Sequence, residues 1–139
     1  MKIFLFYIGK ARDANWNAAS EVFIKRASRY SKIEMREIHP DRTDLWSRHA
    51  AATKVLLDPS GKMLDSREMS QLIQRHELEA RDMVFIVGPH QGFSQEWRKR
   101  ADLLLSLSRM TLPHELARAI LAEQIYRAFT MLRGHPYPR

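Results

Sequence analysis

Few side chains in this 139-residue chain are suited to nucleophilic or metal-dependent chemistry. The chain has no cysteine, which excludes disulfides, thiolate metal sites and thiol nucleophiles. Its six histidines, at positions 39, 49, 76, 90, 114 and 135, show no metal-ligand spacing. The motifs of zinc proteases, of serine hydrolases and of calcium-binding loops are also missing. We therefore predict neither a bound metal nor a metal-dependent reaction.

The remaining candidates for chemistry lie in the last quarter of the chain. His114 stands at the start of the last expected helix, where it can act as a base, contact RNA or simply occupy a helix N-terminus. Glu123 and Arg127 have the spacing of a helical surface ion pair. The terminal segment RGHPYPR (133–139) is basic and aromatic, as are many side chains that bind phosphates and stack on bases. A frayed terminus is the alternative for this segment.

Alternating strand and helix signals must position these groups. Apolar and β-branched runs predict strands over 2–8, 33–38, 54–57, 83–87 and 103–108. Amphipathic spacing and capping residues predict helices over 16–30 and, weakly, 43–52, then after Asp65, after Ser94 and from Pro113 to Arg133. Strand followed by helix, five times over, predicts an α/β fold with a mostly parallel sheet. The length indicates a single domain spanning residues 1–139.

Three turns stand where ligands bind in such sheets, beyond the carboxyl ends of strands. They cover residues 57–62, 88–93 and 108–113. The first contains Asp-Pro-Ser-Gly and the second contains two glycines, so we expect tight turns with positive φ at glycine. The second turn lacks the patterns of nucleotide-binding loops. Ser106 and Ser108 interrupt an apolar strand and need hydrogen-bond partners.

The net charge of +7 favours a polyanionic partner such as nucleic acid, although a merely basic soluble protein is equally compatible with it. Residues 1–50 carry ten basic and six acidic groups, residues 51–108 eight of each, and residues 109–139 five and two. We therefore expect the basic ends to contact nucleic acid. The chain has no apolar run long enough to span a membrane. Its N-terminus is typical of a strand rather than a signal peptide, so a cytoplasmic location is expected.

Three segments together resemble a known family: LLDPSGK (56–62), FIVGPHQG (85–92) and LSLSRMTLPHELARAILAEQIYRAFTMLRGHPYPR (105–139). They are similar to the RlmH-type ribosomal large-subunit pseudouridine methyltransferases of the SPOUT superfamily, weakly before residue 53 and strongly after it. The resemblance implies an α/β fold with a C-terminal trefoil knot and a homodimer. It also implies methyl transfer from S-adenosylmethionine to N3 of a pseudouridine in 23S rRNA of the assembled ribosome.

The resemblance also implies which residues hold the cofactor, largely through backbone groups. They belong to the three turns: Leu57, Gly88, Pro89, Ser108, Arg109, Met110, Thr111, Leu112 and Pro113. Two residues depart from the family pattern. Pro89 replaces a glycine and lacks an N–H, so only its carbonyl can contact a ligand. Pro138 replaces a histidine that the family has near its C-terminus.

Methylation at N3 requires the loss of a weakly acidic proton, which a base or a nearby cation assists. The candidates are Arg127 and Arg139 for cationic stabilisation and phosphate contact, Tyr137 for stacking or hydrogen bonding, and His114 as the base. In a homodimer, a basic terminus can complete the site of the partner chain.

Two other functional hypotheses remain open from the sequence. One is a non-catalytic ribosome-binding factor with the same fold, which Pro89 and Pro138 favour and the intact SxxTLP loop disfavours. The other is an α/β protein that binds a flavin or a phosphate ligand. For the homodimer, the wide apolar stripe of the last helix predicts an interface with some of Leu116, Ile120, Phe129 and Leu132.

Overall fold

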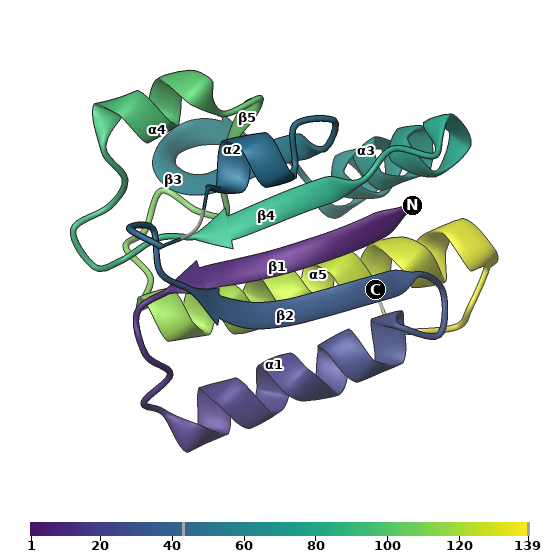
Figure 1. Cartoon of the computed structure of the whole chain (residues 1–139). Helices are drawn as coiled ribbons and strands as arrows, with labels where there is room; N and C mark the ends of the chain where they lie inside the picture. The colour runs from purple at the N-terminus through teal and green to yellow at the C-terminus, as the bar shows by residue number, and fades with distance from the viewer. Residues whose placement is uncertain (43, 139) are drawn as a thin grey trace.

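The computed structural model describes residues 1–42 and 44–138. Strands and helices alternate along the chain as predicted (Figure 1). The elements are β1 (Lys2–Ile8), α1 (Ala14–Ala27), β2 (Lys32–Ile38), α2 (Leu45–Arg48), β3 (Thr53–Met63), α3 (Ser66–Glu79), β4 (Met83–Val87), α4 (Gln95–Arg100), β5 (Leu103–Ser106) and α5 (His114–Arg133). Arg139, one of the catalytic candidates, lies outside the described residues.

The five strands form one parallel sheet in the order β2-β1-β4-β3-β5, so the predicted α/β class is confirmed. All five residues of the central strand β4 are buried. In this order, β3, β4 and β5 are neighbours, and their carboxyl ends lie at one edge of the sheet. The three turns chosen from the sequence are therefore brought together.

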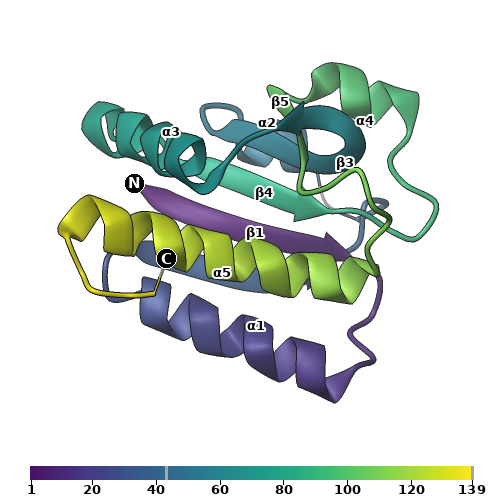
Figure 2. The ribbon, with the colours of Figure 1, turned by 180° about the vertical axis from the view of Figure 1, so that it is seen from behind.

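The two faces of the sheet are covered unequally. Helices α1, α3 and α5 cover one face, with α5 lying between the other two (Figure 2). The short helices α2 and α4 cover the opposite face (Figure 1). Each face has its own apolar core, centred on Leu121 and Ile125 under the long helices, and on Phe6 and Leu56 under the short ones. Among the described residues, no helix is long and apolar enough to cross a membrane.

Side-chain caps explain where the helices begin. Asp13 accepts hydrogen bonds from two backbone N–H groups of α1, so this helix starts two residues earlier than predicted. Asp65 and Glu68 form the expected capping box of α3, and Ser94 caps α4. The helix predicted over 43–52 is confined to the four residues of α2, and its predicted first residue lies outside the described part of the chain.

The predicted strand over 54–57 is present, but its predicted end was wrong, because β3 continues to Met63 through a ring-shaped excursion (Figure 1). Both Leu57 and Lys62 pair with Leu105, so the intervening residues loop out and return to the same point of β5. A Cβ atom on Gly61 would lie 2.5 Å from the carbonyl carbon of Leu104. Only glycine permits this close crossing of two backbones. Strand β5 also ends at Ser106, two residues earlier than predicted.

Of the α5 residues expected at a dimer interface, Phe129 is not available on the surface of the chain. Phe129 is fully buried within the chain and stacks on Tyr30 with ring centroids 5.8 Å apart. The flanking helices α1 and α3 cover much of the apolar stripe that the sheet alone would leave exposed. Leu116, Ile120 and Leu132 are only half-buried.

Candidate cofactor pocket and C-terminal cluster

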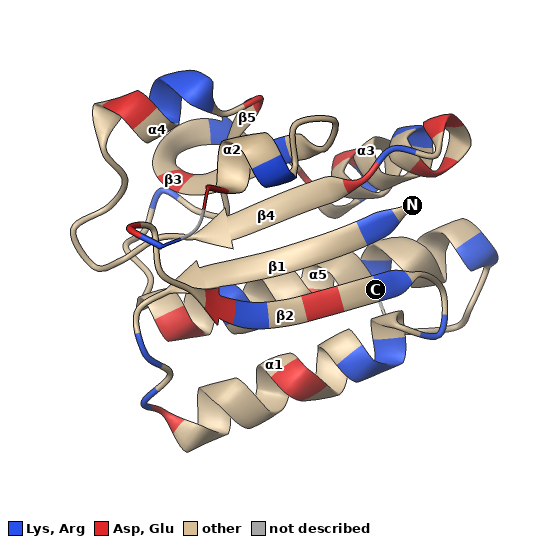
Figure 3. Cartoon of the chain, viewed as in Figure 1, with Lys and Arg blue, Asp and Glu red and all other residues tan. Residues whose placement is uncertain are grey.

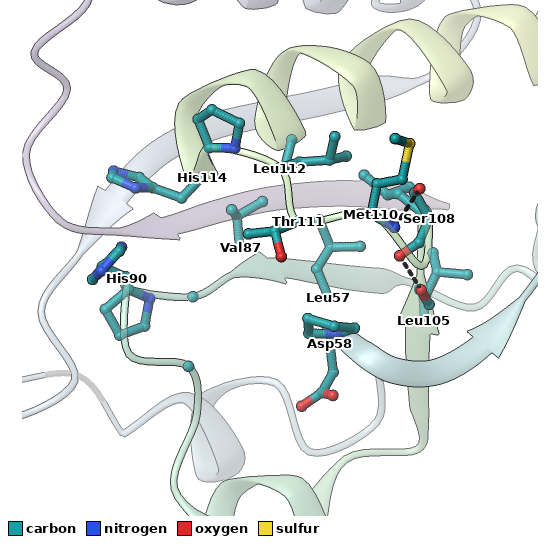
Figure 4. A pocket seen from close by; sticks show the side chains of 18 residues that line it. Leu57, Asp58, Val87, His90, Leu105, Ser108, Met110, Thr111, Leu112 and His114 are labelled. Carbon is teal, nitrogen blue, oxygen red and sulfur yellow. Dashed lines mark hydrogen bonds between the residues drawn. The ribbon is translucent and has the colours of Figure 1, made fainter.

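A cavity of about 600 Å³ opens at the carboxyl ends of β3, β4 and β5 (Figure 4). Its walls come from the three turns and the first residues of α5: Leu57, Asp58, Pro59, Val87, Gly88, Pro89, His90, Gly92, Leu105, Ser106, Leu107, Ser108, Met110, Thr111, Leu112, Pro113, His114 and Ala117. Its volume is in the range of pockets that enclose cofactors and other small molecules. Largely apolar walls with a few polar groups suit an elongated ligand that has both apolar and polar parts.

The structure places eight of the nine predicted cofactor residues on the wall of this pocket. The exception is Arg109, which is exposed and does not line the cavity. His114 also lies on the wall, and Figure 4 shows its ring at the same end of the pocket as His90. Asp58 and His90 lie within the turns chosen from the sequence but were not named among the cofactor residues, and Val87 directly precedes the second turn.

Two serines shape the turn between β5 and α5. Ser106, which is buried, donates its hydroxyl hydrogen to the carbonyl of Ser108 at 2.9 Å. The hydroxyl oxygen of Ser108 accepts the Met110 backbone N–H, also at 2.9 Å (Figure 4). The two serines thus find the partners that their burial requires. These bonds hold residues 108–110 in a compact turn on the pocket wall.

The turn after β4 uses its two glycines for different reasons. Gly92 has φ of +83°, as predicted, and donates its N–H to the carbonyl of Pro89 at 2.9 Å. Gly88 does not have positive φ, so that part of the prediction was wrong. A Cβ on Gly88 would instead lie 2.8 Å from the ring of Phe93. This glycine is required by the close packing of the ring beneath the turn.

Asp58 is the one carboxylate on the pocket wall, and only 8% of its surface is exposed. Its burial acts to raise the pKa of the carboxyl group, but hydrogen bonds from the Ser60 hydroxyl and backbone N–H outweigh burial. Arg98, whose Nε lies 3.4 Å from the carboxylate, lowers the pKa further. The net effect is a pKa below the ordinary value, so Asp58 is charged at neutral pH.

A second polar group forms on α5, away from the pocket. Arg127 pairs with Glu123 at 2.8 Å and donates to the carbonyl of Pro138 at 2.6 Å. Tyr137 donates its hydroxyl hydrogen to Glu123 at 2.8 Å, and its ring packs edge-on against Tyr126. We call Glu123, Arg127 and Tyr137 the C-terminal cluster. Residues 137 and 138 are therefore folded back on α5 rather than frayed.

The pKa of the Tyr137 hydroxyl lies above its ordinary value. Burial is the main cause, because it disfavours the charged phenolate. The neighbouring Glu123 carboxylate raises the pKa further, because it accepts the hydroxyl hydrogen bond and repels a second negative charge. Tyr137 is therefore a neutral hydrogen-bond donor at neutral pH.

The C-terminal cluster and the pocket lie far apart within one chain. His114 is on the pocket wall, and Arg127 follows thirteen residues later on the same helix, which places them about 20 Å apart along the axis. Neither Arg127 nor Tyr137 lines the pocket. Of the catalytic candidates that the structure describes, only His114 is at the pocket.

The class of protein follows from the comparisons with known proteins. A family described as "Predicted SPOUT methyltransferase" matches residues 1–138. A probable methylase family protein from Haemophilus influenzae Rd KW20 superposes with a TM-score of 0.67 at 10% identity, over 99% of this chain and 70% of the other. The SpoU methyltransferase AviRb from Streptomyces viridochromogenes, solved in complex with AdoMet, superposes with a TM-score of 0.52 at 13% identity, over 94% and 61% of the two chains. These neighbours confirm the expected knotted α/β fold.

A curated relative identifies the family within the SPOUT methyltransferases. The ribosomal RNA large subunit methyltransferase H of Solibacter usitatus is 58% identical over 139 residues, covering both chains completely. The chain therefore belongs to the ribosomal RNA large subunit methyltransferase H family of SPOUT methyltransferases, as its sequence resemblance indicated.

Proposed function

We propose that this protein transfers the methyl group of S-adenosylmethionine to N3 of a pseudouridine in 23S rRNA of the assembled ribosome. Family membership supports methylation of large-subunit rRNA. The pocket at the carboxyl ends of β3, β4 and β5 is the observation that carries the proposal, because it joins the three turns implied by the resemblance. A ribosomal substrate also implies a cytoplasmic location.

The pocket residues fit S-adenosylmethionine. Leu57, Val87 and Leu105 offer apolar walls for the adenine ring, while the turn at 107–113 offers backbone groups for the polar parts. The bound cofactor supplies an activated methyl group on a sulfonium sulfur. The pocket must orient this group toward the acceptor nitrogen and exclude water, and such positioning can supply much of the rate.

Proton removal from N3 requires groups near the pocket mouth. We assign His114 as the base, because it lines the pocket. Arg127 and Tyr137 would stabilise the deprotonated base and bind the RNA, and the Glu123 carboxylate orients both side chains. Because this pair lies about 20 Å along α5 from the pocket of its own chain, these roles require a second chain.

We therefore include a homodimer in the proposal, in which the C-terminal cluster of one chain completes the pocket of the other. The half-buried Leu116 and Ile120 are available on α5 for such an interface. Ile120 also lines a second cavity of about 300 Å³ between α3 and α5. The family resemblance supports the same assembly. Light scattering should report twice the mass of one chain at micromolar concentration, and a monomer would contradict the proposal.

A methylation assay on ribosomes that lack this modification tests the reaction, with protein-free rRNA assayed beside them. We expect incorporation at one pseudouridine of the ribosome, together with calorimetric binding of S-adenosylmethionine. Binding to ribosomes without cofactor binding would instead favour the non-catalytic factor. Mixing Thr111→Pro with Tyr137→Phe protein tests the shared site, because mixed dimers contain one intact composite site and should regain activity.

A further inference from the structure

The two helical layers differ in charge. The ten residues of α2 and α4 carry four basic side chains, Arg48, Arg98, Lys99 and Arg100, against a single acid, Glu96. The three long helices of the opposite layer carry seven basic and six acidic side chains. In Figure 3, the Lys and Arg positions, drawn in blue, occupy much of the α4 ribbon and one end of α2. The positive excess of the helices therefore lies on the thinner layer.

Ion pairs form in both layers: on α4, Arg98 lies 3.4 Å from Asp58 and Arg100 lies 3.8 Å from Glu96. On α5, Arg118 lies 3.9 Å from Glu115, Arg127 pairs with Glu123, and Arg133 pairs with Glu77. Three of the four basic side chains that the structure describes in residues 109–138 thus have carboxylate partners. Among the described residues, neither Arg48 nor Lys99 has a carboxylate within ion-pair distance, and both are exposed.

Aromatic packing holds the Arg100 side chain and joins the two short helices. The Arg100 guanidinium lies over the Trp46 ring, 4.7 Å from its centroid. Trp46 packs edge-on against Trp97, and Trp97 stacks on Phe93. Helices of four and six residues are not stable alone, so this cluster fixes α2 against α4. The cations are consequently presented on a preformed surface.

The same surface borders the cofactor pocket. Arg98 lies 3.4 Å from Asp58 on the pocket wall, and its Nη2 donates to the Ser60 hydroxyl at 2.8 Å. Helix α4 begins three residues after Gly92, which also lines the pocket. A nucleotide whose base enters the pocket mouth would therefore place its neighbouring phosphates within reach of α4.

We propose that α2 and α4 form an RNA-contacting surface in addition to the C-terminal cluster, with Arg48 and Lys99 binding phosphates of the strand that flanks the methylated nucleotide. This assignment rests on the proposed rRNA methylation and names a surface that serves it. Exposed cations without acidic partners are the groups that release counterions from nucleic acid on binding. Contacts to phosphate position the RNA without reading its sequence.

The test compares two variants of equal charge. Arg48→Gln/Lys99→Gln removes two cations from the proposed surface, and the matched control Lys25→Gln/Arg29→Gln removes two exposed cations from the opposite layer. Affinity for ribosomes that lack the modification is measured between 50 and 200 mM salt. At about 100 mM salt we expect roughly tenfold weaker binding for the surface variant. Its slope of log affinity against log salt should be smaller by about 1.5, for two lost phosphate contacts.

Further measurements distinguish a wrong surface assignment from a wrong proposed function. The surface variant should bind S-adenosylmethionine like the wild type and should raise KM for ribosomes rather than lower kcat. An unchanged salt slope, or an equal loss in the control, would overturn the surface assignment. Loss of binding to ribosomes but not to protein-free rRNA would also overturn it, because the surface would then face a ribosomal protein. Absence of methylation by the wild type would contradict the proposed function, while the salt slopes would still test the surface.

Discussion

The cofactor pocket and the C-terminal cluster are formed by different kinds of chemical groups. The pocket consists of backbone turns and apolar side chains, shaped by glycines, prolines and two serines. The C-terminal cluster consists of charged and polar side chains, joined by an ion pair at 2.8 Å and a hydrogen bond of the same length. Both depend on α5, which begins at the pocket and carries the cluster near its other end.

This contrast predicts how each region responds to mutation. Backbone shape holds the pocket, so changes that add a Cβ or remove an N–H should damage it, whereas truncation of nearby exposed side chains should not. Side-chain groups hold the C-terminal cluster, so single polar substitutions should disable it without affecting cofactor affinity.

Gly61→Val should have the largest effect, because its Cβ would lie 2.5 Å from backbone atoms of Leu104, which cannot move aside independently. We expect a loss of about 3 kcal/mol or more in the free energy of unfolding, together with loss of S-adenosylmethionine binding. Denaturant unfolding and calorimetry measure the two effects. Lys62→Ala, at an exposed neighbouring position, is the control and should change stability by less than about 0.5 kcal/mol. Wild-type stability in the valine variant would refute the close crossing.

Thr111→Pro should weaken S-adenosylmethionine binding at least tenfold while leaving the fold intact. The substitution removes an N–H and restricts φ in a turn on the pocket wall, and the residue is exposed. Calorimetric titration is the measurement. Arg109→Ala serves as the control, since that side chain does not line the pocket and its loss should leave affinity unchanged. Unchanged cofactor affinity in Thr111→Pro would count against the assignment of this turn to the cofactor.

Tyr137→Phe should lower methylation while leaving S-adenosylmethionine affinity intact. It removes the hydroxyl that donates to Glu123, a loss of about 1 kcal/mol in the free energy of unfolding. Deletion of residues 135–139 should likewise spare cofactor binding and reduce ribosome binding and methylation. Affinities for cofactor and ribosome are measured on the same preparations. An equal loss of both affinities would show that the terminal segment closes over the cofactor instead.

Asp58 should make the pocket sensitive to acid, with the smallest effect of the series. Its pKa is lower in the folded chain than in the unfolded one, so its stabilising contribution is complete above about pH 4 and decreases as pH falls through the folded pKa. The difference in unfolding free energy between wild type and Asp58→Asn should therefore shrink below about pH 4. A difference that stays constant from pH 3 to pH 7 would contradict this role for the carboxylate.

Most of the fold could be predicted from local sequence signals. Alternating apolar runs and caps such as Asp65 and Ser94 define each element independently of the others. The exceptions depend on distant contacts. Trp16 fits the apolar face predicted for α1, yet it is 39% exposed, because Ser20, Ile24 and Ala27 face the core. Helix α2 packs against α4 through the Trp46–Trp97 contact, which no local pattern reports.

The sequence by itself determined the order of elements, the three turns and the family resemblance, because each is a property of residue types at short spacing. Only the tertiary structure decided that these turns enclose one pocket, since their proximity depends on the strand order β2-β1-β4-β3-β5. It also decided which charges are free: Arg133 meets Glu77 across 56 positions of sequence, whereas Lys99 meets no carboxylate among the described residues. The Arg133–Glu77 ion pair and the crossing at Gly61 are long-range contacts, and spacing along the chain does not encode them.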